Sequence, residues 1–168
     1  MHHTLKPPLS LDSSPNLQQH DAEQLRQDIK NYFLQTFSCY ESLFECLTEQ
    51  GFYHKAIALR HPLIFYYGHT ATFFVNKLLL AKLIPERVDP HFEALFAIGV
   101  DEMSWDDLDD RHYTWPSIQA VHAYRQKVKA LVLHFIDTHP LQAPINWQHP
   151  WWAVMMAIEH ERIPLETS

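Results

Sequence analysis

The residues best suited to chemistry in this sequence are two histidines far apart along the chain, His69 and His160. Neutral imidazoles that converge from different helices are a common way to hold a transition metal ion. Each also has an ordinary interpretation: His69 as a core histidine bonded to a carboxylate or hydroxyl, and His160 as a histidine interacting with the dipole at a helix C-terminus. Gly68, directly before His69, costs a helix about 1 kcal/mol relative to alanine, which indicates that another group packs closely there.

The residue four positions after His160 interrupts the metal-binding pattern. A histidine there would place two imidazoles on one helical face, because side chains at i and i+4 are neighbours. The sequence has Pro164 instead, whose ring removes the N–H that would bond the His160 carbonyl and clashes with that carbonyl. We therefore expect the helix to stop at Pro164. The nearest carboxylates are Glu161 and Glu166, and a chain that turns back after the proline would make Glu166 the candidate third ligand.

Four amphipathic segments must position these residues. Apolar side chains recur at helical spacing, and the second segment is apolar almost all round, which marks a central helix. The expected helices cover about 21–50, ended by Gly51, then 62–84, 115–137, and 150 to Pro164. The long connection 86–116 joins the second to the third. This pattern predicts an all-α four-helix bundle over 21–168 with a long crossover loop, preceded by a mobile N-terminal arm at 1–20.

Composition narrows the class of protein. A chain of 168 residues with 46% hydrophobic residues can bury the core of one domain, and three glycines are few for an all-β fold. A formal net charge of −7 argues against nucleic acid as a partner. The apolar run at 78–81 is flanked by charged residues, so no membrane span is expected. Cys39 and Cys46 would lie about 10 Å apart on a helix, too far for a disulfide, so we expect reduced core residues. No signal peptide is visible, and the expected location is cytoplasmic.

Three separated motifs carry a resemblance to a known family. They are Arg60-His61-Pro62-Leu63-Ile64-Phe65-Tyr66-Tyr67-Gly68-His69-Thr70, then Phe96-Ala97-Ile98-Gly99-Val100-Asp101-Glu102-Met103-Ser104-Trp105-Asp106-Asp107, and the segment 155–168. In order and spacing they resemble the DinB-like domain of iron-dependent sulfoxide synthases, in particular the 5-histidylcysteine sulfoxide synthases of ovothiol biosynthesis. The resemblance covers roughly residues 20–168.

The resemblance implies a non-haem iron(II) held by three histidines, and an oxygen-dependent coupling of cysteine sulfur to the imidazole of histidine. His69 then matches the first ligand and His160 the second, while the third falls at Pro164. Three neutral imidazoles suit Fe(2+) and leave positions open for a thiolate and oxygen. Family members join the bundle to a domain of the formylglycine-generating-enzyme type. The sequence ends at Ser168, so the expected partner is a separate domain of that type, or a second copy of the chain.

The resemblance therefore implies ancestry and fold more firmly than catalysis by this chain alone. One alternative is a degenerate DinB-like bundle that serves as an interaction module. Another is a stand-alone DinB-like hydrolase or thiol transferase that uses a divalent metal ion. The acidic stretch 101–110 is expected to be a solvated loop anchored by its tryptophan. We expect a docking surface at one end of the bundle, where these residues would gather: Trp105, Trp147, Trp151 and Trp152.

Overall fold

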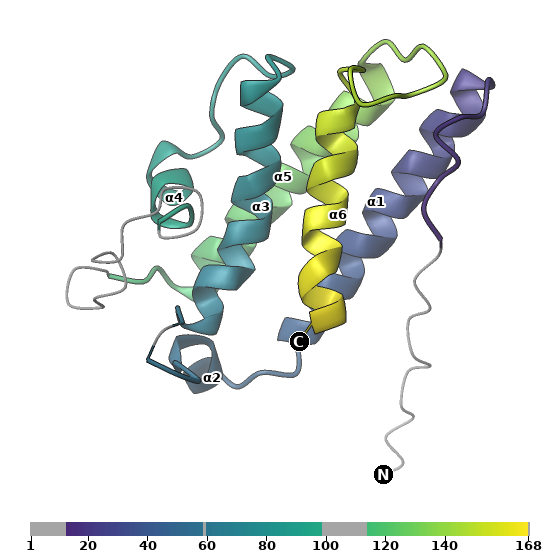
Figure 1. Cartoon of the computed structure of the whole chain (residues 1–168). Coiled ribbons are helices and arrows are strands. Elements are labelled where there is room, and N and C mark those ends of the chain that lie inside the picture. The colour runs from purple at the N-terminus through teal and green to yellow at the C-terminus, as the bar shows by residue number, and fades with distance from the viewer. Residues whose placement is uncertain (1–12, 59, 99–113, 168) are drawn as a thin grey trace.

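The computed structural model describes residues 13–58, 60–98 and 114–167, with side chains up to 165. In this part of the chain every regular element is a helix, which confirms the all-α class (Figure 1). The helices are α1 (Ala22–Phe44), α2 (Glu49–Tyr53), α3 (Leu63–Leu80), α4 (Pro90–Leu95), α5 (Ile118–Thr138) and α6 (Trp152–Thr167).

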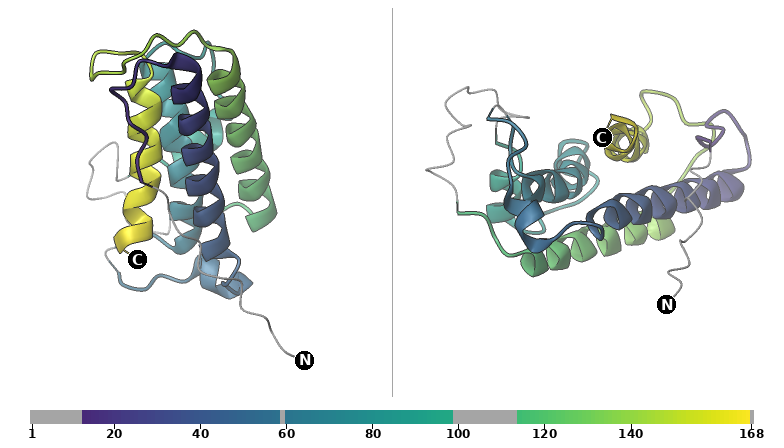
Figure 2. Two further views of the ribbon diagram at one scale, coloured as in Figure 1. Left: turned by 90° about the vertical axis from the view of Figure 1, so that its right-hand side faces the viewer. Right: turned by 90° about the horizontal axis from the view of Figure 1, so that it is seen from below.

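The four long helices form the expected bundle. Helix α3 packs against α5 and α6, and α1 packs against the same two, so α1 and α3 lie on a diagonal (Figure 2). Aromatic side chains fill much of the centre: the ring of Phe33 lies 5.4 Å from that of Phe37 and 5.4 Å from that of Phe74. None of the helices in the described residues is long and apolar enough to cross a lipid bilayer.

The first long helix is shorter than expected. Helix α1 starts after Asp21, whose side chain accepts hydrogen bonds from the first-turn amides, and it ends at Phe44 rather than near residue 50. Thr48 then caps a separate short helix, α2, by accepting a bond from the amide of Gly51. Gly51 therefore lies inside α2 and does not end the first helix. The reason is that a threonine side chain stabilises a new helix start better than a continuing helix.

The crossover between the second and third long helices is confirmed, but it contains a short helix that the sequence pattern did not predict. Helix α3 ends at Leu80, four residues earlier than expected, and Lys82 follows with a positive φ of 57°. Asp89 then caps α4 with a proline at its first turn. Glu93 reaches back to accept bonds from the amides of residues 88 and 89, both at 2.9 Å. The Asp-Pro-x-x-Glu spacing was the available signal for this helix start.

Part of the segment expected to be a mobile arm is held against the bundle. The amide of Ile145 donates to the carbonyl of Leu17 at 2.9 Å, and Gln18 Nε2 donates to the carbonyl of Ile145 at 3.3 Å. Residues 13–20 are thus tied to the connection between α5 and α6. The first twelve residues lie outside the described part of the chain.

The last helix does not stop at the proline. Helix α6 runs from Trp152 through Pro164 to Thr167, so the expected end at Pro164 is wrong. Side chains on both sides of the proline hold this last stretch: Arg162 donates to Thr36 Oγ1 at 3.3 Å, and Leu165 packs against the smaller of the two hydrophobic clusters. These contacts stabilise the final turn although Pro164 cannot donate a hydrogen bond to the His160 carbonyl.

Candidate metal centre

His69 lies in the middle of α3, where it is 5% exposed. The glycine before it is required by close packing, as expected. A Cβ atom added to Gly68 would stand 2.5 Å from two ring carbons of Phe96, a separation at which one of them must move. Phe96 itself is the residue that ends α4. The crossover segment therefore packs directly onto the turn of α3 that carries the histidine.

The backbone of Phe96 also sets the orientation of the His69 ring. His69 Nδ1 lies 2.7 Å from the Phe96 carbonyl oxygen, and only an N–H can bond a carbonyl oxygen. The neutral ring therefore carries its proton on Nδ1 and its lone pair on Nε2. Metal-binding histidines are commonly oriented in this way, by a carbonyl that accepts from the nitrogen that does not bind the metal.

His160 comes from the facing helix. Its ring centroid lies 5.1 Å from that of His69, and the two rings meet edge to face at 67°. The phenyl ring of Phe73, one turn after His69 on α3, stacks on the His160 imidazole at 3.7 Å with an angle of 4°. Helices α3 and α6 thus bring together the two histidines that the sequence pattern singled out.

The separation of the two rings suits a shared metal ion. Metal–nitrogen bonds of about 2.0–2.1 Å at tetrahedral or octahedral angles put the centroids of two imidazole ligands about 5 Å apart. The donor set is nonetheless short of the three ligands expected from the resemblance. Among the side chains that the structure describes, no group of three histidine, cysteine, aspartate or glutamate residues is placed to hold an ion. The two imidazoles are placed to bind one ion together, but the described side chains offer no third ligand.

Glu166 was expected as a third ligand on the condition that the chain turns back after Pro164. The structure does not meet this condition, because α6 continues in helical conformation to Thr167. In a regular helix a residue six positions after His160 lies on a different face. The side chain of Glu166 is outside the described part of the structure. Glu161, the other candidate carboxylate, points elsewhere, as described below.

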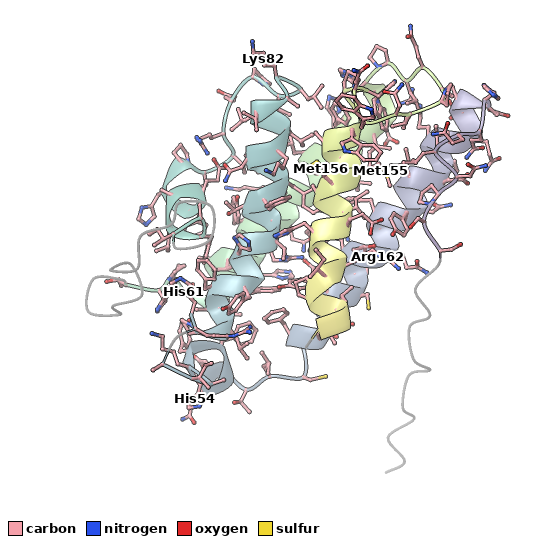
Figure 3. The ribbon with its side chains drawn as sticks, in the orientation of Figure 1. His54, His61, Lys82, Met155, Met156 and Arg162 are labelled. Atoms are coloured by element: carbon pink, nitrogen blue, oxygen red, sulfur yellow. The ribbon has the colours of Figure 1, made fainter. Side chains whose placement is uncertain are left out.

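His69 belongs to a row of rings that begins just before α3 and continues along the helix, and this row was not predicted from the sequence. His61, Phe65, His69 and Phe73 follow one another at intervals of four residues. His61 stacks on Phe65 with centroids 4.0 Å apart, and Phe65 is parallel to His69 at 5.4 Å and 11°. His61, labelled in Figure 3, lies 3.2 Å through Nε2 from the carbonyl of Ile98, so both histidines bond the same crossover segment.

A buried ionic network next to the histidines was not predicted from the sequence. Arg125 and Glu161 are both fully buried, and Arg125 Nη2 donates to Glu161 Oε1 at 2.9 Å. Thr70 Oγ1 donates to the same oxygen at 3.1 Å and accepts from Arg125 Nη1 at 2.8 Å. Glu41 adds a second carboxylate, 3.3 Å from Arg125 Nε. This network joins all four long helices.

Arg125 is charged despite its burial. Burial alone would lower the pKa of the guanidinium, but the Glu161 carboxylate and its hydrogen bond hold that pKa above its usual value. Three aromatic rings surround the group, with Phe37 at 4.3 Å, Tyr67 at 4.8 Å and Tyr40 at 5.1 Å from the guanidinium carbon. The Val-x-x-Tyr-Arg-x-x-Val pattern at 121–128 was a signal, because the arginine directly follows a core position of the helix.

The expected tryptophan surface is only partly present. Trp151 is fully buried and donates through Nε1 to the carbonyl of Pro140 at 2.9 Å, so it belongs to the core. Trp152 is half-buried, whereas Trp147 is 72% exposed. Trp105 and the acidic stretch 101–110 lie outside the described residues.

The two cysteines differ in burial, and neither forms a disulfide. Cys39 is half-buried, whereas Cys46 is exposed, so Cys46 is not the core residue that was expected.

Comparison with known proteins places the chain in a family. The model of the DinB superfamily matches residues 32–167, which include the second half of α1, the other three long helices and both histidines of the candidate centre. Among the curated proteins no match to the chain is found. Because the match extends over most of its length, this chain belongs to the DinB superfamily.

Proposed function

We propose that this chain binds a divalent transition metal ion between α3 and α6, with His69 and His160 as its protein ligands. The observation that carries the proposal is the pairing of the two rings at 5.1 Å together with the 2.7 Å bond that directs the Nε2 lone pair of His69 away from Phe96. Imidazole ligands suit zinc, iron, copper and nickel rather than magnesium or calcium. Two protein ligands give a weaker site than three, and leave further positions to water or substrate.

The resemblance to 5-histidylcysteine sulfoxide synthases makes iron(II) the ion of first choice. Under this proposal the chain is the metal-binding bundle of an oxygen-dependent enzyme that couples cysteine and histidine. Such an ion would supply the oxygen chemistry when bound. What the described residues contribute is the orientation of two imidazoles, by the Phe96 carbonyl on one side and by stacking on Phe73 on the other. With two ligands present, catalysis requires a further ligand from outside the described set.

A second candidate function, an interaction module, is favoured by apolar side chains beside the histidines. Met156 and Ile163 are 42% and 57% exposed, and they lie seven residues apart on α6 with His160 between them. Residues at this spacing share one side of a helix. An exposed apolar stripe of this kind suits a contact with another domain. We propose that a formylglycine-generating-enzyme-type domain, or a second copy of the chain, covers this side rather than a tryptophan-rich end.

Calorimetric titration of the purified chain with Fe(II), under anaerobic conditions, and separately with Zn(II) tests the metal proposal. We expect one ion per chain. Because each variant removes a direct ligand, His69→Ala and His160→Ala should each weaken binding by about tenfold or more. The matched control is His134→Ala, which removes an exposed histidine from α5. Binding that survives both ligand substitutions, or that falls equally with the control, would refute the site. Tighter binding of Zn(II) than of Fe(II) is expected at any imidazole site, so the metal proposal rests on the effect of the ligand substitutions and not on the order of the two ions.

A further inference from the structure

A cleft at the end of the bundle closed by α2 has features of a binding site. It occupies about 530 Å³ between the last turn of α1, helix α2, the first turns of α5 and one residue of α3. Helix α2 stands at the bottom of Figure 1, where it covers the lower end of α3. Volumes of 300–1,000 Å³ are typical of sites for small molecules.

The floor of this cleft is aromatic and rigid. Phe44, Phe52 and Tyr67 are all buried, and each ring contacts the other two, with centroids 4.6–5.7 Å apart. They come from three different helices, so the packing of the bundle fixes their mutual orientation. Such a floor gives a ligand a preformed apolar surface and needs little rearrangement when the ligand binds.

The rim of the cleft is acidic. Glu41, Glu45 and Glu49 line it, and none of the ion pairs among the described residues involves Glu45 or Glu49. Glu41 and Glu45 are four residues apart at the C-terminal end of α1, whose last turn has no basic residue. Like charges at this spacing repel each other, and carboxylates at the negative end of a helix dipole are unfavourable. Glu41 is paired with Arg125, so the charges that would favour a cation in the cleft are mainly those of Glu45 and Glu49.

The polar groups in the wall are compatible with a cation. Tyr67 Oη lies 2.9 Å from Nδ1 of His122. This hydrogen bond pairs the Tyr67 hydroxyl with the His122 ring in the wall of the cleft. Arg125 lies on the far side of Tyr67, but the carboxylates of Glu161 and Glu41 accept its hydrogen bonds. The glutamates therefore determine the sign of the potential at the mouth of the cleft.

We propose that this cleft binds a small organic ammonium ion with an apolar body, whose hydrocarbon part lies on the aromatic floor and whose charge lies among Glu41, Glu45 and Glu49. A bare metal cation is not the expected ligand, because no three carboxylate or imidazole side chains among the described residues are grouped to hold one. The floor binds the apolar body and the carboxylates attract the charge, so floor and rim act on two parts of the same ligand. The site does not involve the two histidines, and the proposal stands independently of metal binding.

Three probes of similar shape and different charge test the proposal: phenethylammonium, neutral 2-phenylethanol and anionic phenylacetate. Binding is followed by NMR through the side-chain resonances of Tyr67 and His122. We expect the cation to bind about tenfold more tightly than the alcohol, and the anion to bind most weakly. Raising the salt concentration from 20 to 500 mM should weaken binding of the cation and leave that of the alcohol unchanged.

The decisive variant is the double substitution Glu45→Gln/Glu49→Gln, which keeps the shape of two exposed side chains and removes their charge. It should reduce the affinity for the cation to that for the alcohol. Glu86→Gln, an exposed glutamate elsewhere on the surface, is the matched control and should change nothing. Equal affinities for the cation and the alcohol in the unsubstituted protein would overturn the proposal, and so would a preference for the cation that survives the double substitution.

Discussion

Two polar clusters lie one residue apart on the same pair of helices, and they differ in almost every respect. His69 and His160 lie among phenylalanine rings, and no third ligand completes the pair within the described side chains. The next residues, Thr70 and Glu161, bond each other and Arg125 inside the bundle. His160 lies on the side of α6 that also carries the exposed Met156 and Ile163, whereas Thr70 and Glu161 are shielded from solvent.

The difference shows which cluster positions the other. The bond from Thr70 to Glu161 joins α3 to α6 at the level of the histidines, and Arg125 joins both to α5. A slip of one helix along the other would break these bonds and separate the imidazoles. We therefore expect the ionic network to hold the register in which His69 and His160 meet.

Removal of the charge on Glu161 should have the largest effect on stability. Glu161→Gln leaves a buried guanidinium with Glu41 as its remaining carboxylate, and we expect the free energy of unfolding to fall by about 3 kcal/mol. Urea denaturation measures this. The control is Asp137→Asn, which breaks the 2.7 Å surface ion pair with Lys30 and should cost less than about 1 kcal/mol.

A double substitution separates the charge from the packing. Arg125→Met/Glu161→Leu removes both fully buried charges and should recover much of the loss, because the carboxylate that stays behind, Glu41, is partly exposed. If Glu161→Gln instead unfolds at the same urea concentration as the unsubstituted protein, the network does not hold the register, and the comparison between the two clusters fails.

Substitution of Gly68 should have an intermediate effect, and it tests the histidine cluster. Gly68→Ala places a Cβ atom 2.5 Å from the Phe96 ring, and overpacking of this kind costs about 1–3 kcal/mol. The displaced Phe96 backbone should also weaken its bond to His69, seen as a shift of the Nδ1 resonance. Gly51→Ala is the control: its Cβ would meet nothing nearer than 3.5 Å, so the higher helix propensity of alanine should make it neutral or stabilising. A Gly68→Ala protein as stable as Gly51→Ala would contradict the tight packing.

Substitution of Pro164 should have the smallest effect on stability and the clearest effect on metal binding. Pro164→His restores both the N–H that can bond the His160 carbonyl and an imidazole one turn after His160. Because the position is in the last turn of α6, we expect a gain of about 1 kcal/mol rather than the full cost of an internal proline. Metal affinity should rise by about tenfold or more, because a third ligand joins the first two.

Pro164→Ala separates these two contributions. It restores the same N–H without an imidazole, so it should match Pro164→His in melting temperature but bind metal no better than the unsubstituted chain. If the histidine variant binds Fe(II) and Zn(II) only as tightly as the alanine variant does, position 164 does not point toward the ion, and the proposed site is wrong.

Much of the architecture could be predicted from the sequence because helical periodicity is a local property. The repeat of apolar residues along α1 and α5, and the nearly continuous apolar surface of α3, indicated buried helices directly. The separation of His69 and His160 onto two such helices suggested a site between them. Helix ends were predicted less well, since Thr48 and Asp89 start helices through single side-chain bonds that compete with nearby turn signals.

The sequence by itself determined the helical class, the order of the long helices, and which residue types could bind a metal ion. Only the tertiary structure decided that Arg125 is buried and that α6 continues through Pro164. An arginine next to a core position is compatible with either exposure or burial, and the choice depends on a carboxylate supplied by another helix. A proline disfavours a helix locally by a few kcal/mol, which packing of Leu165 and bonding of Arg162 can offset. Both outcomes depend on partners distant in sequence, and local patterns carry no information about those partners.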